Sequence, residues 1–167
     1  MFFIDEGIDS GDILGKEPYM IEDTDYAADV RRKIGEATAI LSRRVLMQIM
    51  TGTLNPVKQN EEDATYLLKR SPEDGLIDWN APLKEIHTLV RAVSWPLPGA
   101  FGMYDGKHRL IIWRAEMLEN KKYIGMNGQI AEIADNHIDV VCRDGLLRIM
   151  DYENVDKVKL FVGHKLR

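Results

Sequence analysis

The stretch MFFIDEGIDSGDIL, residues 1–14, decides how the first part of this chain folds. Residues 1–4 are continuously apolar, and residues 5–12 form a loop that contains Gly7 and Gly11. An apolar run without polar alternation, followed by a glycine-bearing loop, is typical of a strand that is buried on both faces of a parallel sheet. We therefore expect a buried strand at residues 1–4, which requires neighbouring strands and covering helices.

The next pattern predicts a long amphipathic helix. Apolar residues recur at steps of three and four from residue 26 to residue 49, and Gly52 lies where a helix terminator belongs. The stripe consists of Tyr26, Val30, Ile34, Ala37, Leu41, Val45 and Ile49. One or two strands and one helix cannot cover both faces of a parallel sheet. This region therefore either pairs with another chain or forms the end of a larger α/β domain.

Residues 53–79 have the composition of a connector. They contain two prolines, a run of charged residues and no sustained apolar period, so we place a domain boundary there. Pro82 then favours the start of a short helix over residues 83–93, because proline is suited to the first turn. The segment SWPLPGAF, residues 94–101, ends this helix with two prolines and a glycine.

The remainder of the chain is predicted to be all-β. Short apolar segments alternate with tight turns such as the Asp105-Gly106 turn. The expected strands are residues 101–104, 110–115, 129–133, 138–142 and 146–150. Five short strands at this spacing favour a small barrel or Greek-key sheet of the OB-like type.

The composition excludes several classes of protein. The formal net charge of −5 argues against an electrostatic nucleic-acid or lipid binder. No apolar run approaches the ~20 residues that cross a bilayer, and residues 1–4 lack the basic region of a signal peptide. A single cysteine, Cys142, rules out an internal disulfide, and the four histidines share no metal-ligand spacing. We expect a cytoplasmic protein that binds neither a metal nor a membrane.

The loop at residues 5–12 carries three aspartates and is the best candidate site. A calcium-binding EF-hand loop starting at Asp5 is excluded, because its third position is Gly7 and its twelfth is Lys16. One interpretation is a plain turn built from turn-forming residues. The other is a carboxylate, that of Asp9, displayed at the end of a buried strand, where α/β sheets place their sites. No phosphate-binding glycine loop or serine nucleophile motif accompanies it, so the residues alone do not form a complete active site.

Several segments, in this order, resemble the methionyl-tRNA formyltransferase family. They are FFIDEGIDSGDIL at 2–14, EDGLIDW at 73–79, IHTLVRAVSWPLPGAF at 86–101, DGKHRLIIW at 105–113 and CRDGLLRI at 142–149. The resemblance implies transfer of a formyl group from 10-formyltetrahydrofolate to a primary amine. It also implies a catalytic asparagine and histidine in a His-x-Ser-Leu-Leu-Pro segment and a catalytic aspartate in a Gly-Leu-Asp-Thr-Gly-Asp segment. Of these, only the aspartate has a counterpart here, Asp9 in GIDSGD at 7–12.

The resemblance predicts an α/β fragment followed by a small all-β domain. Residues 1–55 correspond to the end of a Rossmann-like formyltransferase domain, residues 56–98 to a linker with a short helix, and residues 99–167 to an OB-like domain. The asparagine and histidine would lie upstream of residue 1, in a part that this chain lacks. We therefore expect the chain alone to be inactive, and leave open whether residue 1 is a natural start.

The acceptor and partners are predicted from weaker features. From Asp105 onward, eleven Lys and Arg residues face ten Asp and Glu residues, which is poor for phosphate recognition. Together with KRSPEDG at 69–75, this favours an amino sugar of a sugar nucleotide over initiator methionyl-tRNA. The alternative is a non-catalytic OB-like binding or dimerisation module, for example one that binds tRNA. Exposed apolar residues in 1–4 and 26–49 predict a homo-oligomer or a complementing N-terminal half.

Overall fold

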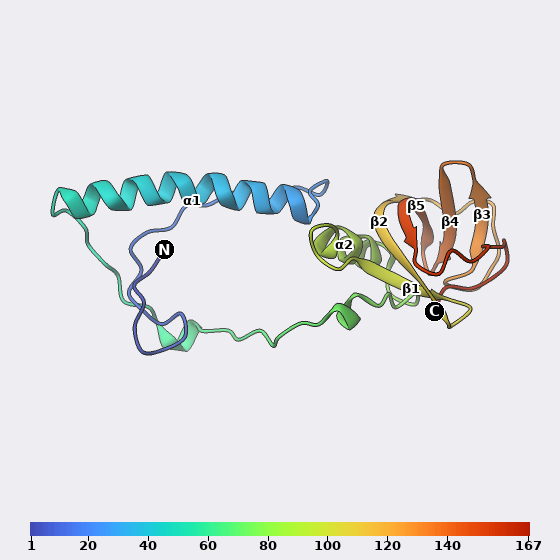
Figure 1. Ribbon diagram of the computed structural model, residues 1–167, viewed down its shortest axis with the longest axis horizontal. Helices are drawn as coiled ribbons and strands as arrows, with labels where there is room; N and C mark the ends of the chain where they lie inside the picture. Colours follow the sequence, from blue (N-terminus) through green and yellow to red (C-terminus); the bar gives the residue numbers. More distant parts are fainter. The chain divides into compact units, whose positions relative to one another are not determined.

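A computed structural model describes all residues from 1 to 167 (Figure 1). By internal packing the chain divides into two units. The helix unit comprises residues 1–24 and 29–69, and the sheet unit comprises residues 25–28 and 70–167. Each unit is described by itself. No helix in either unit combines the length and the apolar character needed to cross a bilayer.

The helix unit is built on α1 (Ala27–Met50), which confirms the long helix predicted from the apolar stripe. Gly52 adopts a φ of +66°, the left-handed conformation that commonly terminates helices. Arg44 fastens the preceding segment to the helix, donating 2.7 Å hydrogen bonds to the Glu17 carboxylate and to the Lys16 carbonyl. Of the helix residues, only Leu41 and Val45 are buried.

The predicted buried strand at residues 1–4 is wrong for this chain. Phe2 forms an isolated antiparallel bridge with Ile13, and no longer strand develops. The four side chains are exposed, from 40% for Phe2 to 96% for Ile4. The physical reason is that an apolar run signals a tendency to be buried, whereas burial itself requires partner strands and a covering layer, which the helix unit does not contain.

The connector from residue 53 to residue 69 is mostly extended. Val57 pairs with Ile13 in an antiparallel bridge, and a short 3-10 helix, η1 (Glu61–Asp63), follows. Tyr66, Leu67 and Leu68 are 83%, 98% and 91% exposed.

The sheet unit contains a five-stranded antiparallel sheet in the order β1-β2-β5-β4-β3. All five predicted strands and the short helix are confirmed, with strand β2 and strand β5 longer than expected. The elements are η2 (Pro72–Gly75), α2 (Leu83–Val93), β1 (Ala100–Tyr104), β2 (His108–Leu118), β3 (Ile130–Ala134), β4 (His137–Cys142) and β5 (Gly145–Asn154).

Helix α2 packs on the sheet through one apolar face. Leu83, Ile86 and Val90 on this face are buried in the same core as Ile112 and Leu147 of the sheet. The Asp144 carboxylate accepts a 2.8 Å hydrogen bond from the Leu83 N–H, which satisfies a donor in the first turn of the helix. Although α2 lies within the range predicted to be a linker, it is part of the core of the sheet unit.

The last residues of the chain contact both edges of the sheet. Arg167 exchanges two backbone hydrogen bonds with Met103 of β1, and Leu166 donates one to Gly128, just before β3. Leu166 is fully buried. The C-terminal segment therefore bridges the two edge strands (Figure 1), so that few of their backbone groups remain unpaired.

Candidate functional site

The loop that carries Asp9 is ordered by its own polar groups. The Asp5 carboxylate accepts hydrogen bonds from the Gly7 N–H at 3.1 Å and from the Ser10 hydroxyl at 2.8 Å. The ends of the loop are joined by a 3.0 Å hydrogen bond from the Phe3 N–H to the Asp12 carbonyl. Asp9 itself has a φ of +58°, a left-handed conformation that only a few per cent of non-glycine residues adopt.

Gly11 is required by a close approach of the backbone. A Cβ atom at this position would lie 1.9 Å from the Phe3 carbonyl oxygen, so any other residue would push the two segments apart. Glycine is therefore required here because a side chain would not fit, and not because of a positive φ.

Asp9 lies on the wall of a hollow of about 750 Å³ in the helix unit. The wall includes two cations, Lys16 and Lys58, and the side chains of Asn60 and Tyr66. The Asp9 carboxylate makes no hydrogen bond or ion pair within the chain. A carboxylate in this position can accept a hydrogen bond from a bound amine or from an imidazolium group. The helix unit contains no histidine, because all four histidines belong to the sheet unit.

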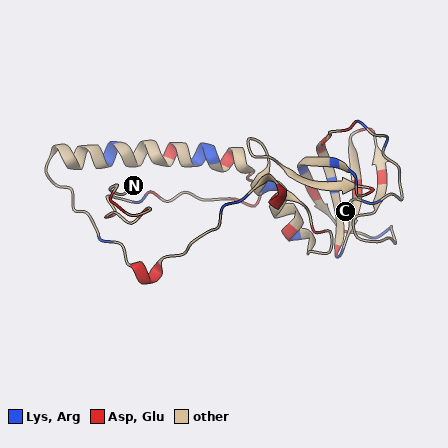
Figure 2. Ribbon diagram, turned by 60° about the horizontal axis from the view of Figure 1, so that its bottom comes forward, with Lys and Arg blue, Asp and Glu red and all other residues tan.

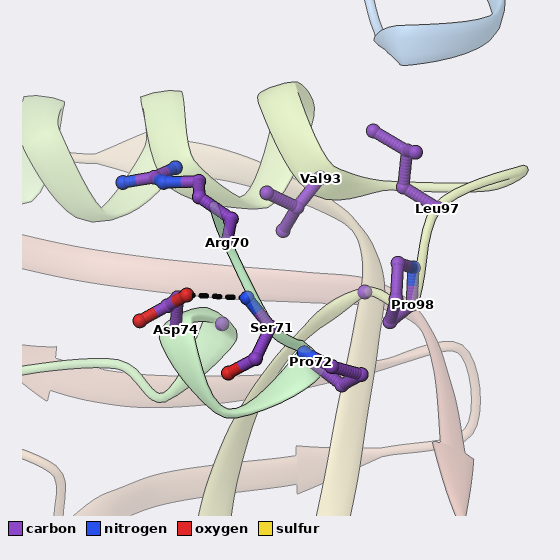
Figure 3. Close-up of a pocket in the computed structure, with 9 residues that line it drawn as sticks. Arg70, Ser71, Pro72, Asp74, Val93, Leu97 and Pro98 are labelled. Carbon is purple, nitrogen blue, oxygen red and sulfur yellow. Dashed lines mark hydrogen bonds between the residues drawn. The ribbon is translucent and has the colours of Figure 1, made fainter. Parts of the chain in front are cut away.

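A second, smaller hollow of about 230 Å³ lies in the sheet unit, between η2 and the segment after α2 (Figure 3). Figure 3 shows Val93, Leu97 and Pro98 on one side and Ser71 with Asp74 on the other. The Ser71 N–H donates a 2.6 Å hydrogen bond to the Asp74 carboxylate. This hollow was not predicted from the sequence, although both segments carry the family resemblance.

A glycine contact brings these two segments together. A Cβ atom on Gly75 would lie 2.6 Å from the Gly99 carbonyl oxygen. The Ile77 N–H also donates a 2.9 Å hydrogen bond to Phe101 of β1. A hydrogen bond from the Ser71 hydroxyl lowers the pKa of Glu73, which keeps that exposed side chain ionised.

Three histidines and the cysteine of the sheet unit have structural surroundings that do not suggest a catalytic role. Nε2 of His87 donates a 3.0 Å hydrogen bond to the Ala115 carbonyl, and burial lowers the pKa of this histidine. Burial also raises the pKa of the Cys142 thiol to about 12, which leaves it a weak nucleophile. His108 and His164 pair with the carboxylates of Asp156 and Asp105, at 2.9 and 2.8 Å.

Several solved structures have a fold similar to that of this chain. The chain is similar to methionyl-tRNA formyltransferase from Clostridium thermocellum, with 28% identity and a TM-score of 0.56 over 86% of this chain and 55% of that one. An N-formyltransferase from Helicobacter canadensis, in complex with folinic acid and dTDP-3-aminofucose, gives 22% identity and 0.57 over 91% and 54%. HypX from Aquifex aeolicus, in complex with tetrahydrofolic acid, gives 20% and 0.73 over 92% and 26%.

The family follows from the sequence match. The family described as formyl transferase, C-terminal domain, matches residues 69–160, which is more than half of the chain. The chain belongs to this family, and the predicted resemblance to formyltransferases is confirmed. The chain spans about a quarter of HypX and about half of the two formyltransferases that it matches.

Proposed function

We propose that this chain supplies the catalytic aspartate and the C-terminal domain of a folate-dependent N-formyltransferase. The observation that carries the proposal is Asp9, whose carboxylate lacks a partner within the chain and which lines a hollow, in the GIDSGD motif of a chain that belongs to a formyl transferase family. The donor is 10-formyltetrahydrofolate, and the acceptor is a primary amine.

The proposed chemistry assigns Asp9 to proton transfer. The acceptor nitrogen forms a bond to the formyl carbon, the bond from that carbon to the folate nitrogen breaks, and the proton of the amine moves to the folate nitrogen. A carboxylate beside a histidine stabilises the imidazolium and raises its pKa, so that the histidine can accept this proton. The histidine and the asparagine that stabilises the oxyanion have no counterpart in this chain, so we expect the chain alone to be inactive.

The domain assignment is part of this proposal. Residues 1–55 form the end of a Rossmann-like catalytic domain and residues 99–167 an OB-like barrel. Of the predicted linker at residues 56–98, helix α2 packs in the core of the barrel domain. Support for the first assignment comes from the exposed apolar side chains of residues 1–4 and α1. Support for the barrel comes from the C-terminal segment, which bridges strand β1 and the start of strand β3.

The same exposed side chains support a partner. Ile34, Leu46 and Met47 on α1 are 44%, 59% and 55% exposed, and an exposed apolar surface of this kind is typical of an interface. We propose that a complementing N-terminal formyltransferase half covers this surface, with a homo-oligomer as the alternative.

The preferred acceptor is the amino group of a sugar nucleotide. Figure 2 shows acidic and basic residues interspersed over the sheet unit, which gives little support for a phosphate-binding face. One observation favours the alternative, an OB-like module that binds tRNA. His164 stacks on Tyr104 at 5.5 Å, and Lys159 lies 5.2 Å from the ring of the half-exposed Phe161. Salt-dependent tRNA binding in a filter assay, without formyl transfer, would favour this alternative.

A reconstitution assay tests the proposed function. The purified chain is mixed with a formyltransferase catalytic segment that carries His-x-Ser-Leu-Leu-Pro, and formyl transfer from 10-formyltetrahydrofolate is measured with an amino-sugar nucleotide and with methionyl-tRNA. We expect activity only in the mixture, and we expect Asp9→Asn to lower it by ~10²-fold or more. Glu6→Gln, which removes a charge from the same loop, is the matched control. Activity of the chain alone, or full activity of the Asp9→Asn mixture, would refute the proposal.

A further inference from the structure

We infer that Gln59 is a positioning residue for Asp9, an inference that rests on the proposed catalytic role of Asp9. Gln59 Nε2 donates two 2.7 Å hydrogen bonds, one to the Asp9 carbonyl and one to the Gly11 carbonyl. The acceptors lie 50 and 48 residues away in the sequence. Both amide hydrogens of one half-buried side chain are therefore committed to the backbone of the candidate site.

The pairing of the two segments explains why Gln59 reaches this loop. Ile13 and Val57 exchange backbone hydrogen bonds of 2.8 and 2.9 Å in an antiparallel bridge. In this antiparallel register Gly11, two residues before Ile13, lies opposite Gln59, two residues after Val57. The backbone pairing stops before that position, and the Gln59 side chain makes the hydrogen bonds to the loop instead.

Asp9 depends on an external clamp for two reasons. Its φ of +58° is a conformation that is unfavourable for an L-residue, so surrounding contacts must maintain it. Its carboxylate has no hydrogen-bond partner within the chain, so no contact of the side chain itself holds the residue in this conformation. A hydrogen bond to the Asp9 carbonyl restrains the adjoining peptide plane and hence the direction of the Cα–Cβ bond from which the carboxylate extends.

The chemistry of glutamine suits this role. A lysine or arginine at the same position would bring a full positive charge beside Asp9 and would stabilise its ionised form through an ion pair. The neutral amide holds the loop through two donors and leaves the carboxylate free to interact with a charged partner in the hollow. Gln59 therefore orients the group without neutralising it.

The clamp itself is tested by NMR on the full chain, independently of activity. The variants are Gln59→Met, which has similar length but no donors, and Gln59→Glu, which has the same shape but no donors when ionised. Gln48→Met is the matched control, because the Gln48 side chain on α1 makes no hydrogen bond. The methyl signals of Leu41 and Val45 report whether the helix unit remains folded.

We expect the two Gln59 side-chain amide hydrogens to exchange at least tenfold more slowly than those of Gln48. Gln59→Met should shift the signals of residues 7–12, and Gln48→Met should leave them unchanged. In Gln59→Glu the loop signals should return toward their native positions on acidification, because a protonated carboxyl regains one donor. Unchanged loop signals in Gln59→Met, with the α1 methyl signals intact, would overturn the inference.

The reconstituted assay tests whether the clamp acts through Asp9. We expect Gln59→Met to lower kcat at least tenfold with less than a twofold change in the acceptor KM. The double variant Gln59→Met/Asp9→Asn should be no slower than Asp9→Asn, because the two residues act as one unit. If kcat of the double variant is a further tenfold lower than that of Asp9→Asn, Gln59 acts independently of Asp9 and the inference is wrong. If Asp9→Asn alone retains full activity, the proposed function fails, and the NMR signals still report separately on the clamp.

Discussion

The helix unit and the sheet unit have equally clear apolar patterns in their sequences, but they differ in how much of the apolar surface is buried. Helix α2 and its strands bury their apolar residues in one core, in which Val90, Ile112 and Leu147 are fully buried. Helix α1 has a longer apolar stripe, yet Leu41 and Val45 are the only hydrophobic side chains that are buried in the helix unit. The comparison teaches that an apolar stripe predicts which face of a helix needs a partner, and that the partner must be found elsewhere.

The two units also differ in what holds their loops. The turns of the sheet unit are short connections between paired strands. The Asp9 loop has no core beneath it and depends on polar contacts from Asp5, Ser10 and Gln59. A site held in this way is sensitive to single hydrogen bonds, which is why the Gln59 variants are informative.

The largest expected difference between the units comes from shortening one leucine in each. Leu147→Ala removes a fully buried side chain in β5 and should lower the free energy of unfolding by about 2–5 kcal/mol, because it leaves a cavity. Leu46→Ala on α1 should change it by less than about 0.5 kcal/mol, because Leu46 is 59% exposed. Urea unfolding measures both, with tryptophan fluorescence for the sheet unit, which contains all three tryptophans, and circular dichroism for α1. Equal losses in the two variants would break the comparison.

A smaller effect is expected from the ion pair across β4 and β5. Arg148 donates two 2.8 Å hydrogen bonds to the carboxylate of Asp139, which is 2% exposed. Arg148→Met should cost about 3 kcal/mol in urea unfolding, because it leaves a buried carboxylate without its cation. The double variant Arg148→Met/Asp139→Val should recover most of this loss. A double variant as unstable as the single one would show that the pair is required for more than its charge balance.

The smallest expected effect is a pH dependence confined to the sheet unit. Burial lowers the pKa of His87 below its unfolded value of about 6.5. Between the two pKa values the unfolded state binds more protons, so stability rises with pH in this window. The contribution is fully present above pH ~6.5 and is lost as the pH falls through the folded-state pKa. Thermal unfolding between pH 7 and pH 5 should show a steeper loss for the native chain than for His87→Gln; parallel curves would contradict this.

The sequence predicted most of the local structure. The apolar periods of α1 and α2 and the turn residues between the strands located these elements to within a few residues. Such signals are local, because the spacing of apolar residues within a segment indicates whether that segment is a helix or a strand. The family resemblance was likewise carried by short segments and is confirmed.

The contacts between distant segments could not be predicted. Residues 1–4 have the pattern of a buried strand, but burial depends on partners that a pattern does not supply. The bridging role of residues 164–167 and the hydrogen bonds of Gln59 join segments far apart in the sequence. The local sequence does not indicate either contact. Gln59 and residues 164–167 would read the same in the sequence if they made no such hydrogen bonds.

Residue-resolved hydrogen exchange on the intact chain tests most directly whether α1 is the element that needs a partner. Amides of α1 around Leu41 and Val45 should exchange at least ~100-fold faster than amides of Val140 and Leu147 in the sheet, because local opening of an element with few buried contacts costs little free energy. Addition of the complementing formyltransferase segment should slow the α1 amides and leave those of the sheet unchanged. Protection of α1 equal to that of the sheet in the chain alone would contradict the account.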